Sequence, residues 1–208
     1  MTTPRVTIVT TVWDRVGCLE QCLRATARST FTDWEQVVVA DCPDPAVVAA
    51  IEQVVAPHRT RVRLRVLPKR ANDWGMTPAH AGLMDAQGEY VAFLSDDNAY
   101  LPDHFGPLVE ALDRDTGLGF AYSSCRYAGR KDLRAAPPRG ALIDLGQPLF
   151  RRDTLRAHFP KGFPYREFAW DWRVIAALME AGVRWRHIDR LTFIFRLAAY
   201  PELVEALA

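Results

Sequence analysis

The stretch that decides the fold is Tyr90-Val91-Ala92-Phe93-Leu94-Ser95-Asp96-Asp97-Asn98, in which an apolar run leads directly into two acids. Its boundaries, Gly88-Glu89 before and polar residues after, are typical of a buried strand in a parallel sheet. Open α/β sheets bind ligands at the carboxyl ends of their strands. Adjacent carboxylates repel each other there, so they need a hard cation or polar ligand groups. A solvated Asp-Asp-Asn turn is the alternative interpretation.

Strands and helices alternate on the N-terminal side of this stretch. Apolar runs predict strands at 5–11, 34–40 and 63–67, the last alternating with arginine as edge strands do. Apolar spacing predicts helices at about 15–28, 45–55, 77–87 and 102–113, with Asp14 capping the first and Thr77 the third. This order predicts an α/β fold: a Rossmann-like, mixed, mostly parallel sheet with helices on both faces, in a single domain.

The C-terminal part has a different pattern. We expect strands at 119–124, 141–145 and 184–188, the last at a sheet edge, and helices at 170–181 and from Pro201 onward. Residues 126–140 are rich in arginine and broken by Pro137-Pro138, which predicts a surface loop. That loop is either a solvated connection or a lid that closes over an anionic ligand.

Composition excludes several classes of protein. The chain has 208 residues, 49% hydrophobic and 25% charged, with a net charge of +1, so we expect a globular protein without a nucleic-acid partner. Because no apolar run resembles a signal peptide or a membrane span, we expect a cytoplasmic protein, with peripheral membrane association left open. The four cysteines do not form a disulfide framework at this size. Cys18 and Cys22 are expected to be buried thiols rather than metal ligands.

Three acidic positions stand out in this predicted fold. Asp41 ends the second strand and Asp96-Asp97 end the fourth, so both sets share one edge of the sheet, while Asp171 opens the late helix. No GxGxxG or GxxxxGK[ST] motif follows a strand, which argues against a Rossmann dehydrogenase and a P-loop NTPase. Acids in place of glycines suggest that a metal ion, rather than backbone N–H groups, holds phosphates at this edge.

With these motifs in order, the chain resembles the family 2 glycosyltransferases of the GT-A fold over most of its length. Five segments carry the resemblance: 6–15, 29–41, 72–90, Ser95-Asp96-Asp97-Asn98 at the position of the DxD-type signature, and Trp170-Asp171-Trp172 followed by Glu180-Ala181-Gly182. The chain departs from the pattern at Ala40, at Ala79-His80 and at Trp170, where relatives often carry an acid, Arg-Asn and a glutamate. These departures put the sugar preference of the donor in doubt.

The resemblance implies a donor site in the first half of the domain, residues 1–120. Thr11 and Trp13 would line the base pocket, and Asp41 would accept the N3–H of uracil or thymine. Asp96 would hold the ribose or a metal-bound water, and Asp97 would ligate Mn²⁺ or Mg²⁺. The implied donor is a nucleotide sugar, a UDP-sugar in preference to a dTDP-sugar.

The resemblance also implies an acceptor-binding half, residues 121–208. Asp171 would be the general base that takes the proton of an acceptor hydroxyl, which would invert the anomeric configuration. The implied acceptor is a sugar, a lipid-linked molecule or a small molecule, and a homodimer is left open. Glu167 is the competing base. His187 is a candidate metal or phosphate ligand, and Lys69, Arg70 and Arg196 are candidate diphosphate partners.

Each role has a structural alternative. Trp13 fits a core position, Asp41 fits a cap of the next helix, and Asp171 fits an N-terminal carboxylate stabilised by the helix dipole. Two alternative functions also stay open. One is a sugar-1-phosphate nucleotidyltransferase, although Thr10 to Asp14 lack the glycine-rich loop that it needs, and the other is a non-catalytic module that binds nucleotide sugars.

Overall fold

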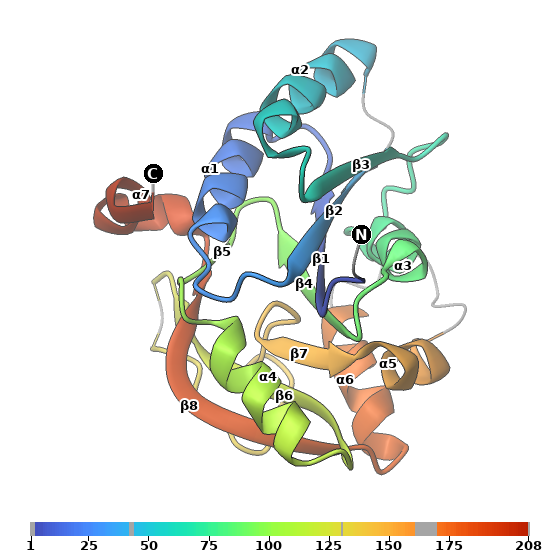
Figure 1. Cartoon of the computed structure of the whole chain (residues 1–208), viewed down its shortest axis with the longest axis vertical. Helices are drawn as coiled ribbons and strands as arrows, with labels where there is room; N and C mark the ends of the chain where they lie inside the picture. The colour runs from blue at the N-terminus through green and yellow to red at the C-terminus, as the bar shows by residue number, and fades with distance from the viewer. Residues whose placement is uncertain (1–2, 42–43, 130, 161–169, 208) are drawn as a thin grey trace.

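One sheet organises the chain in a computed structural model that describes residues 3–41, 44–129, 131–160 and 170–207. The strand order is β3-β2-β1-β4-β7-β6-β8-β5 (Figure 1). The strands are β1 Val6–Val12, β2 Trp34–Ala40, β3 Val62–Val66, β4 Tyr90–Ser95, β5 Ala99–Tyr100, β6 Leu118–Tyr127, β7 Pro148–Arg151 and β8 Arg184–Phe195. Every antiparallel pair among the described strands involves β5 or β7, and the other pairs are parallel, so the sheet is mixed and mostly parallel.

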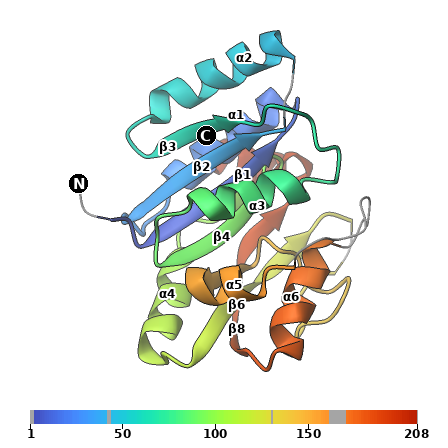
Figure 2. The ribbon, with the colours of Figure 1, turned by 90° about the vertical axis from the view of Figure 1, so that its right-hand side faces the viewer.

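Helices cover both faces of this sheet. Their bounds are α1 Val16–Ala27, α2 Pro45–Val55, α3 Met76–Asp85, α4 Phe105–Arg114, α5 Arg152–His158, α6 Trp170–Glu180 and α7 Pro201–Leu207, with 3₁₀ turns at Ala56–His58 and Leu197–Ala199. Helices α3, α5 and α6 lie together over one face (Figure 2), whereas α1, α2 and α4 pack on the other. None of these helices is both long and apolar enough to cross a membrane.

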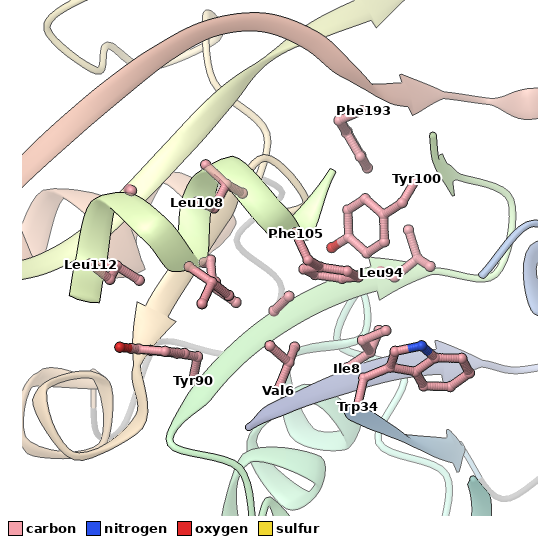
Figure 3. Close-up of a cluster of buried hydrophobic side chains, with 14 of the residues drawn as sticks. Val6, Ile8, Trp34, Tyr90, Leu94, Tyr100, Phe105, Leu108, Leu112 and Phe193 are labelled. Carbon is pink, nitrogen blue, oxygen red and sulfur yellow. The ribbon is translucent and has the colours of Figure 1, made fainter. Parts of the chain in front are cut away.

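The largest buried cluster joins α4 to the middle of the sheet. Figure 3 shows Phe105, Leu108 and Leu112 of α4 lying over Val6 and Ile8 of β1 and over side chains of β4. Alternate residues of β1 and β4 point to this face, as the two-residue period of a strand requires. The opposite residues, among them Val9 and Phe93, pack against α3, α5 and β7 in a second cluster. Because both faces are buried, β1 and β4 are rigid supports for the residues at their carboxyl ends.

The predicted fold class is confirmed, and so are the first three strands, with β3 at the edge of the sheet. The predicted strand at 141–145 is wrong. Ile143 and Leu145 are buried there, but the backbone forms a turn and not a strand. In this turn Asp144 Oδ1 accepts a hydrogen bond from Gly146 N (2.8 Å). The strand is instead β7, and β8 extends from the predicted segment 184–188 to Phe195, where β5 pairs with it.

Both predicted helix caps are also wrong. Helix α1 starts at Val16 with Arg15 at the N-cap position and no side-chain cap. Thr77 lies inside α3, and its N–H and hydroxyl donate to the buried carboxylate of Asp73, at 3.0 and 2.5 Å. Gly75 occupies the N-cap position with φ of +89°, a left-handed conformation that favours glycine.

The arginine-rich loop folds back onto β6 and β8. Leu133 forms a bridge with Cys125, Tyr122 Oη donates to Ala135 O (2.7 Å), and Arg134 pairs with Asp189 (2.6 Å). These contacts fix the middle of the loop, and its function as a lid stays a prediction. Cys18, Cys22 and Cys125 are free thiols; Cys22 is buried as expected, whereas Cys18 is only half-buried, so its predicted burial is wrong. Cys42, Arg130 and the competing base Glu167 lie outside the described residues.

Candidate active site

A pocket of about 690 Å³ opens at the carboxyl edge of β1, β2 and β4. In Figure 2 the chain enters β1 from the left, so this edge lies to the right. The pocket is lined by residues from the strand ends and from the loop before α3: Thr11, Val12, Trp13, Asp14, Arg15, Asp41, Arg70, Asn72, Trp74, Gly75, Pro78, Ser95 and Asp96. It therefore brings together Thr11, Trp13, Asp41 and Asp96, four of the predicted donor-site residues.

The two acids after β4 share one cation. Both carboxylate oxygens of Asp96 accept hydrogen bonds from Arg15, one of them from Nε at 3.2 Å. Nη1 of the same guanidinium donates to Asp97 Oδ2 at 2.5 Å. The Asp96 side chain is 2% exposed, that of Asp97 20% and that of Arg15 52%. A half-exposed arginine thus offsets the charge of a buried acid and its neighbour.

Burial raises the pKa of Asp96 above that of an ordinary aspartate. Loss of hydration, the largest cause, and the charge of Asp97 raise the pKa of Asp96, the attraction of Arg15 lowers it, and the net result is a pKa of about 6. A carboxylate in that position gains from any further positive charge. The site therefore favours a cation at the sheet edge.

Asp41 shapes the pocket that it also lines. Its two carboxylate oxygens accept hydrogen bonds from the backbone N–H groups of Ala71 (2.7 Å) and Asn72 (3.2 Å). These residues begin the loop that leads to α3 and includes Trp74 and Gly75. Asp41 does not cap α2, because that cap is Asp44, whose Oδ1 accepts from Ala46 N. A carboxylate has lone pairs left for a ligand after two such bonds.

Trp13 and Thr11 both line the pocket at the end of β1. Trp13 is 43% exposed, so it is not a core residue, and the guanidinium carbon of Arg70 lies 3.4 Å from its ring centroid. A base that stacks on this ring face has to displace Arg70. A Cβ on Gly75 would lie 3.4 Å from Thr11 Oγ1, so the loop before α3 closes tightly onto the end of β1.

Asp171 lies at the start of α6, outside the residues that line the pocket. Its helix touches the pocket rim through Trp170, whose Nε1 donates to Trp74 O at 3.0 Å. Burial raises the pKa of Asp171, while hydrogen bonds from the backbone N–H groups of Trp172 and Asp171 itself lower it. A carboxylate with a raised pKa is a stronger base, which suits proton transfer.

Asp144 is a candidate that the sequence did not single out. Its pKa is raised to about 7, mainly by burial and also by the charges of Asp171 and Asp97, while the hydrogen bond from the Gly146 N–H lowers it. Asp144 is therefore close enough to both acids to feel their repulsion. An acid inside the apolar run Leu142 to Leu145 was the signal that could have identified it.

The remaining candidates lie around this core. His187 lies on β8, stacked on Tyr122 (4.7 Å between ring centroids) with Nε2 3.1 Å from Ser124 Oγ, and it does not line the pocket. Lys69 is exposed. The Arg196 N–H donates to Asn98 Oδ1 at 2.9 Å, which fastens the end of β8 to the Asp-Asp-Asn turn.

The carboxylate oxygens of this site suit a divalent metal that a bound ligand also helps to coordinate. Within the described residues no group of three or more His, Cys, Asp or Glu side chains is arranged to bind a metal ion. Mg²⁺ bound with phosphates takes only one or two protein carboxylates, with phosphate and water oxygens as its other ligands. Asp96 and Asp97 supply such a pair of hard oxygen ligands, so the residues fit a metal that arrives with a diphosphate.

Comparisons with known proteins place these features in a family. The model of glycosyl transferase family 2 matches residues 7–175. The putative colanic acid biosynthesis glycosyl transferase WcaA of Escherichia coli is 20% identical over 87% of this chain and 62% of its own length. Among solved structures, Staphylococcus aureus TarS in complex with UDP has a TM-score of 0.75 at 16% identity, over 98% of this chain and 64% of that one.

A second solved structure is the mannosyltransferase PcManGT of Pyrobaculum calidifontis in complex with GDP-Man and Mn²⁺. It has a TM-score of 0.75 at 19% identity and covers 95% of this chain and 58% of its own. These likenesses confirm the expected GT-A fold. The chain spans less than two thirds of the length of each of these relatives.

Proposed function

The chain belongs to glycosyl transferase family 2, and we propose that it transfers a sugar from a nucleoside diphosphate donor to an acceptor hydroxyl with inversion. The observation that carries the proposal is the pocket at the carboxyl edge, where an exposed tryptophan, Asp41 and a buried carboxylate line one cavity. TarS binds UDP and UDP-GlcNAc, and PcManGT binds GDP-Man, so nucleoside diphosphate sugars fit this fold. We favour a UDP-sugar for this chain because Asp41 can accept a pyrimidine N3–H.

The donor-binding residues divide into a base end and a phosphate end. Trp13 stacks on the base once Arg70 leaves its ring, and Thr11, near the end of β1, lines the same pocket. Asp96 and Asp97 would hold Mn²⁺ or Mg²⁺, which would supply positive charge against the charge that builds on the departing nucleoside diphosphate. Asp97 is the direct ligand in this proposal, and Asp96 holds ribose or a metal-bound water.

Asp171 acts on the acceptor. Its carboxylate takes the hydroxyl proton as the acceptor oxygen bonds to the anomeric carbon, while the bond from that carbon to the phosphate oxygen breaks and its electron pair leaves with the nucleoside diphosphate. Attack from the face opposite the leaving group inverts the configuration. The hydrogen bond from Trp170 Nε1 to Trp74 O links the start of α6 to the donor pocket.

The test separates binding from chemistry. UDP is titrated into the protein with and without Mn²⁺, and nucleotide sugars are screened for thermal stabilisation, because a bound ligand stabilises the folded form by mass action. We expect Mn²⁺ to tighten UDP binding and one donor to be hydrolysed slowly in the absence of acceptor. Asp97→Asn should abolish the effect of the metal. Asp171→Asn should keep UDP binding and lose transfer by about 10³-fold or more, the size expected for a general base.

Two outcomes would change the proposal. Binding of nucleotide sugars with no turnover by the wild type, with acceptors present, would support a non-catalytic binding module. Full transfer by Asp171→Asn would remove Asp171 as the base and make Glu167 the next residue to test.

A further inference from the structure

We infer that Arg15 occupies the cation position of the site when no donor is bound, and that it must release Asp96 and Asp97 before a divalent metal can bind them. The guanidinium contacts both oxygens of Asp96 and one of Asp97. A metal needs the same oxygens, so the two cations exclude each other. This inference rests on the proposed function only in taking the paired acids as the metal site.

The Arg15 side chain is more exposed than the two acids that it contacts. Its side chain is 52% exposed, whereas those of Asp96 and Asp97 are 2% and 20% exposed, so the guanidinium has more room to move into solvent than the carboxylates have. It sits between the end of β1 and the start of α1, at an N-cap position without a side-chain hydrogen bond to the helix. Moving the guanidinium therefore breaks the ion pairs and leaves the helix start unchanged.

The acids need one cation or the other. Without a partner, the buried carboxylate of Asp96 next to Asp97 would carry both a desolvation penalty and a like-charge repulsion. One guanidinium supplies a single positive charge through three charge-assisted hydrogen bonds, whereas a divalent ion that takes its place has to break these bonds and give up tightly held water molecules. The exchange is thus favourable only when a diphosphate adds its own ligands to the metal. Arg15 also lines the pocket wall, so once released it faces the phosphates that replace it as a partner.

The consequence is a metal site that stays weak until the nucleotide arrives. Mn²⁺ alone has to break three charge-assisted hydrogen bonds, whereas Mn²⁺ with UDP gains phosphate ligands in the same step. Arg15 is therefore a positioning residue that couples the binding of metal and donor. It lowers the affinity for the metal alone more than the affinity for the metal with its diphosphate.

The experiment titrates Mn²⁺ alone into metal-free protein, followed by electron paramagnetic resonance of free Mn²⁺, at about pH 8 so that protons compete little for the acids. Arg15→Gln should bind Mn²⁺ about tenfold more tightly than the wild type, because it loses the competing ion pairs. Without metal, Arg15→Gln should melt at a lower temperature than the wild type, and Mn²⁺ should raise its melting temperature by more. Arg15→Lys, which keeps the charge and loses the forked geometry, should lie between the two.

Arg70→Gln is the matched control. It removes one positive charge from the same pocket, but Arg70 lies over Trp13 and not on the acids. A metal affinity of Arg15→Gln equal to that of Arg70→Gln, or weaker than that of the wild type, would overturn the inference. Metal-free UDP binding that is strong in the wild type and lost in Arg15→Gln would also overturn it, since Arg15 would then replace the metal. If Mn²⁺ binds neither variant nor wild type even with UDP, the metal part of the proposed function fails as well.

Discussion

At the residue scale, Asp41 both lines the pocket and holds the loop before α3 through two hydrogen bonds. Asp41→Asn keeps one acceptor oxygen and places an NH₂ group against a backbone N–H, of Ala71 or of Asn72. We expect a loss of about 1–2 kcal/mol in the free energy of unfolding, the cost of an unpaired buried donor, and about tenfold weaker UDP binding. Urea unfolding and UDP titration measure the two effects.

Asp44→Asn is the control for this prediction. It makes the same change at the N-cap of α2, where aspartate and asparagine cap equally well, so stability should change little. Equal losses in the two variants would mean that the contacts of Asp41 with the loop before α3 add nothing.

His104 gives a prediction about pH. It is 1% exposed, with Nδ1 2.9 Å from Thr192 Oγ1, and burial lowers its pKa to about 3. The unfolded chain takes up a proton near pH 6.5 and the folded one does not, so this residue costs stability increasingly as pH falls from about 6.5 to about 3. Asp96 and Asp144 act in the opposite direction, because their raised pKa values make the folded state take up protons first.

A variant isolates the effect of His104 from that of the acids. His104→Phe keeps the ring that stacks on Tyr100 and loses the bond to Thr192, so at pH 7 we expect it to be about 1 kcal/mol less stable than the wild type. That difference should shrink or reverse by pH 4, because folding of the wild type then requires His104 to give up the proton that it binds in the unfolded chain. Urea unfolding at several pH values tests this, and a difference that stays constant would contradict it.

At this scale the sequence predicted that Asp41 and Asp96 lie at the sheet edge, but not which residues contact them. Asp41 and Asp96 were identifiable because each ends a continuous apolar run, which fixes its place at the sheet edge. Arg15 was not, because its contact with Asp96 spans 81 positions and depends on how α1 docks beside β4. Asp144 escaped for a related reason: its importance comes from Asp171 and Asp97, which approach it only in the folded chain.

At the scale of elements, prediction succeeded where periodicity and burial agree. In the β-α units up to α4 the strands are mostly apolar, except for the edge strand β3 in which arginines alternate, and the helices have one apolar face, so each local pattern has one reading. It failed at 141–145, where Ile143 and Leu145 fill the second cluster from a turn and not from a strand. It also missed β7, a four-residue strand that starts with a proline and reveals itself only through its partners β4 and β6.

Helix α6 supplies a prediction of its own. Trp170→Phe keeps most of the packing in the second cluster and removes the N–H that donates to Trp74 O. If this bond holds Asp171 against the donor pocket, kcat should fall about tenfold, as misplacement of a catalytic group produces, with UDP affinity and acceptor KM little changed. Trp172→Phe, a change of the same kind two residues later, should leave kcat within about twofold, because its side chain makes no such bond among those described. Parallel losses of kcat in both variants would assign the effect to packing.

At the scale of the molecule, the two predicted halves share one sheet. Strand β7 belongs to the second half, yet it pairs with β4 of the first half and with β6, which crosses the division at residue 120. Leu149 and Phe150 of β7 are fully buried, and Phe150 contacts both Phe93 and Phe120. The division at residue 120 therefore describes a proposed division of labour between donor and acceptor, and it does not separate two folding units.

This arrangement predicts one cooperative unfolding transition for the whole chain. Removing residues 121–208 would leave β4 unpaired on one side and α4 without β6, so residues 1–120 alone should not fold. Hydrogen exchange in increasing urea can follow peptides from β1 and β6 separately. We expect both to lose protection at the same urea concentration, and to gain stability together when UDP and Mn²⁺ bind in the first half. If β1 unfolds before β6, or if UDP protects β1 alone, the donor pocket is an independent unit, and the buried contacts of β7 do not couple it to the helix that carries Asp171.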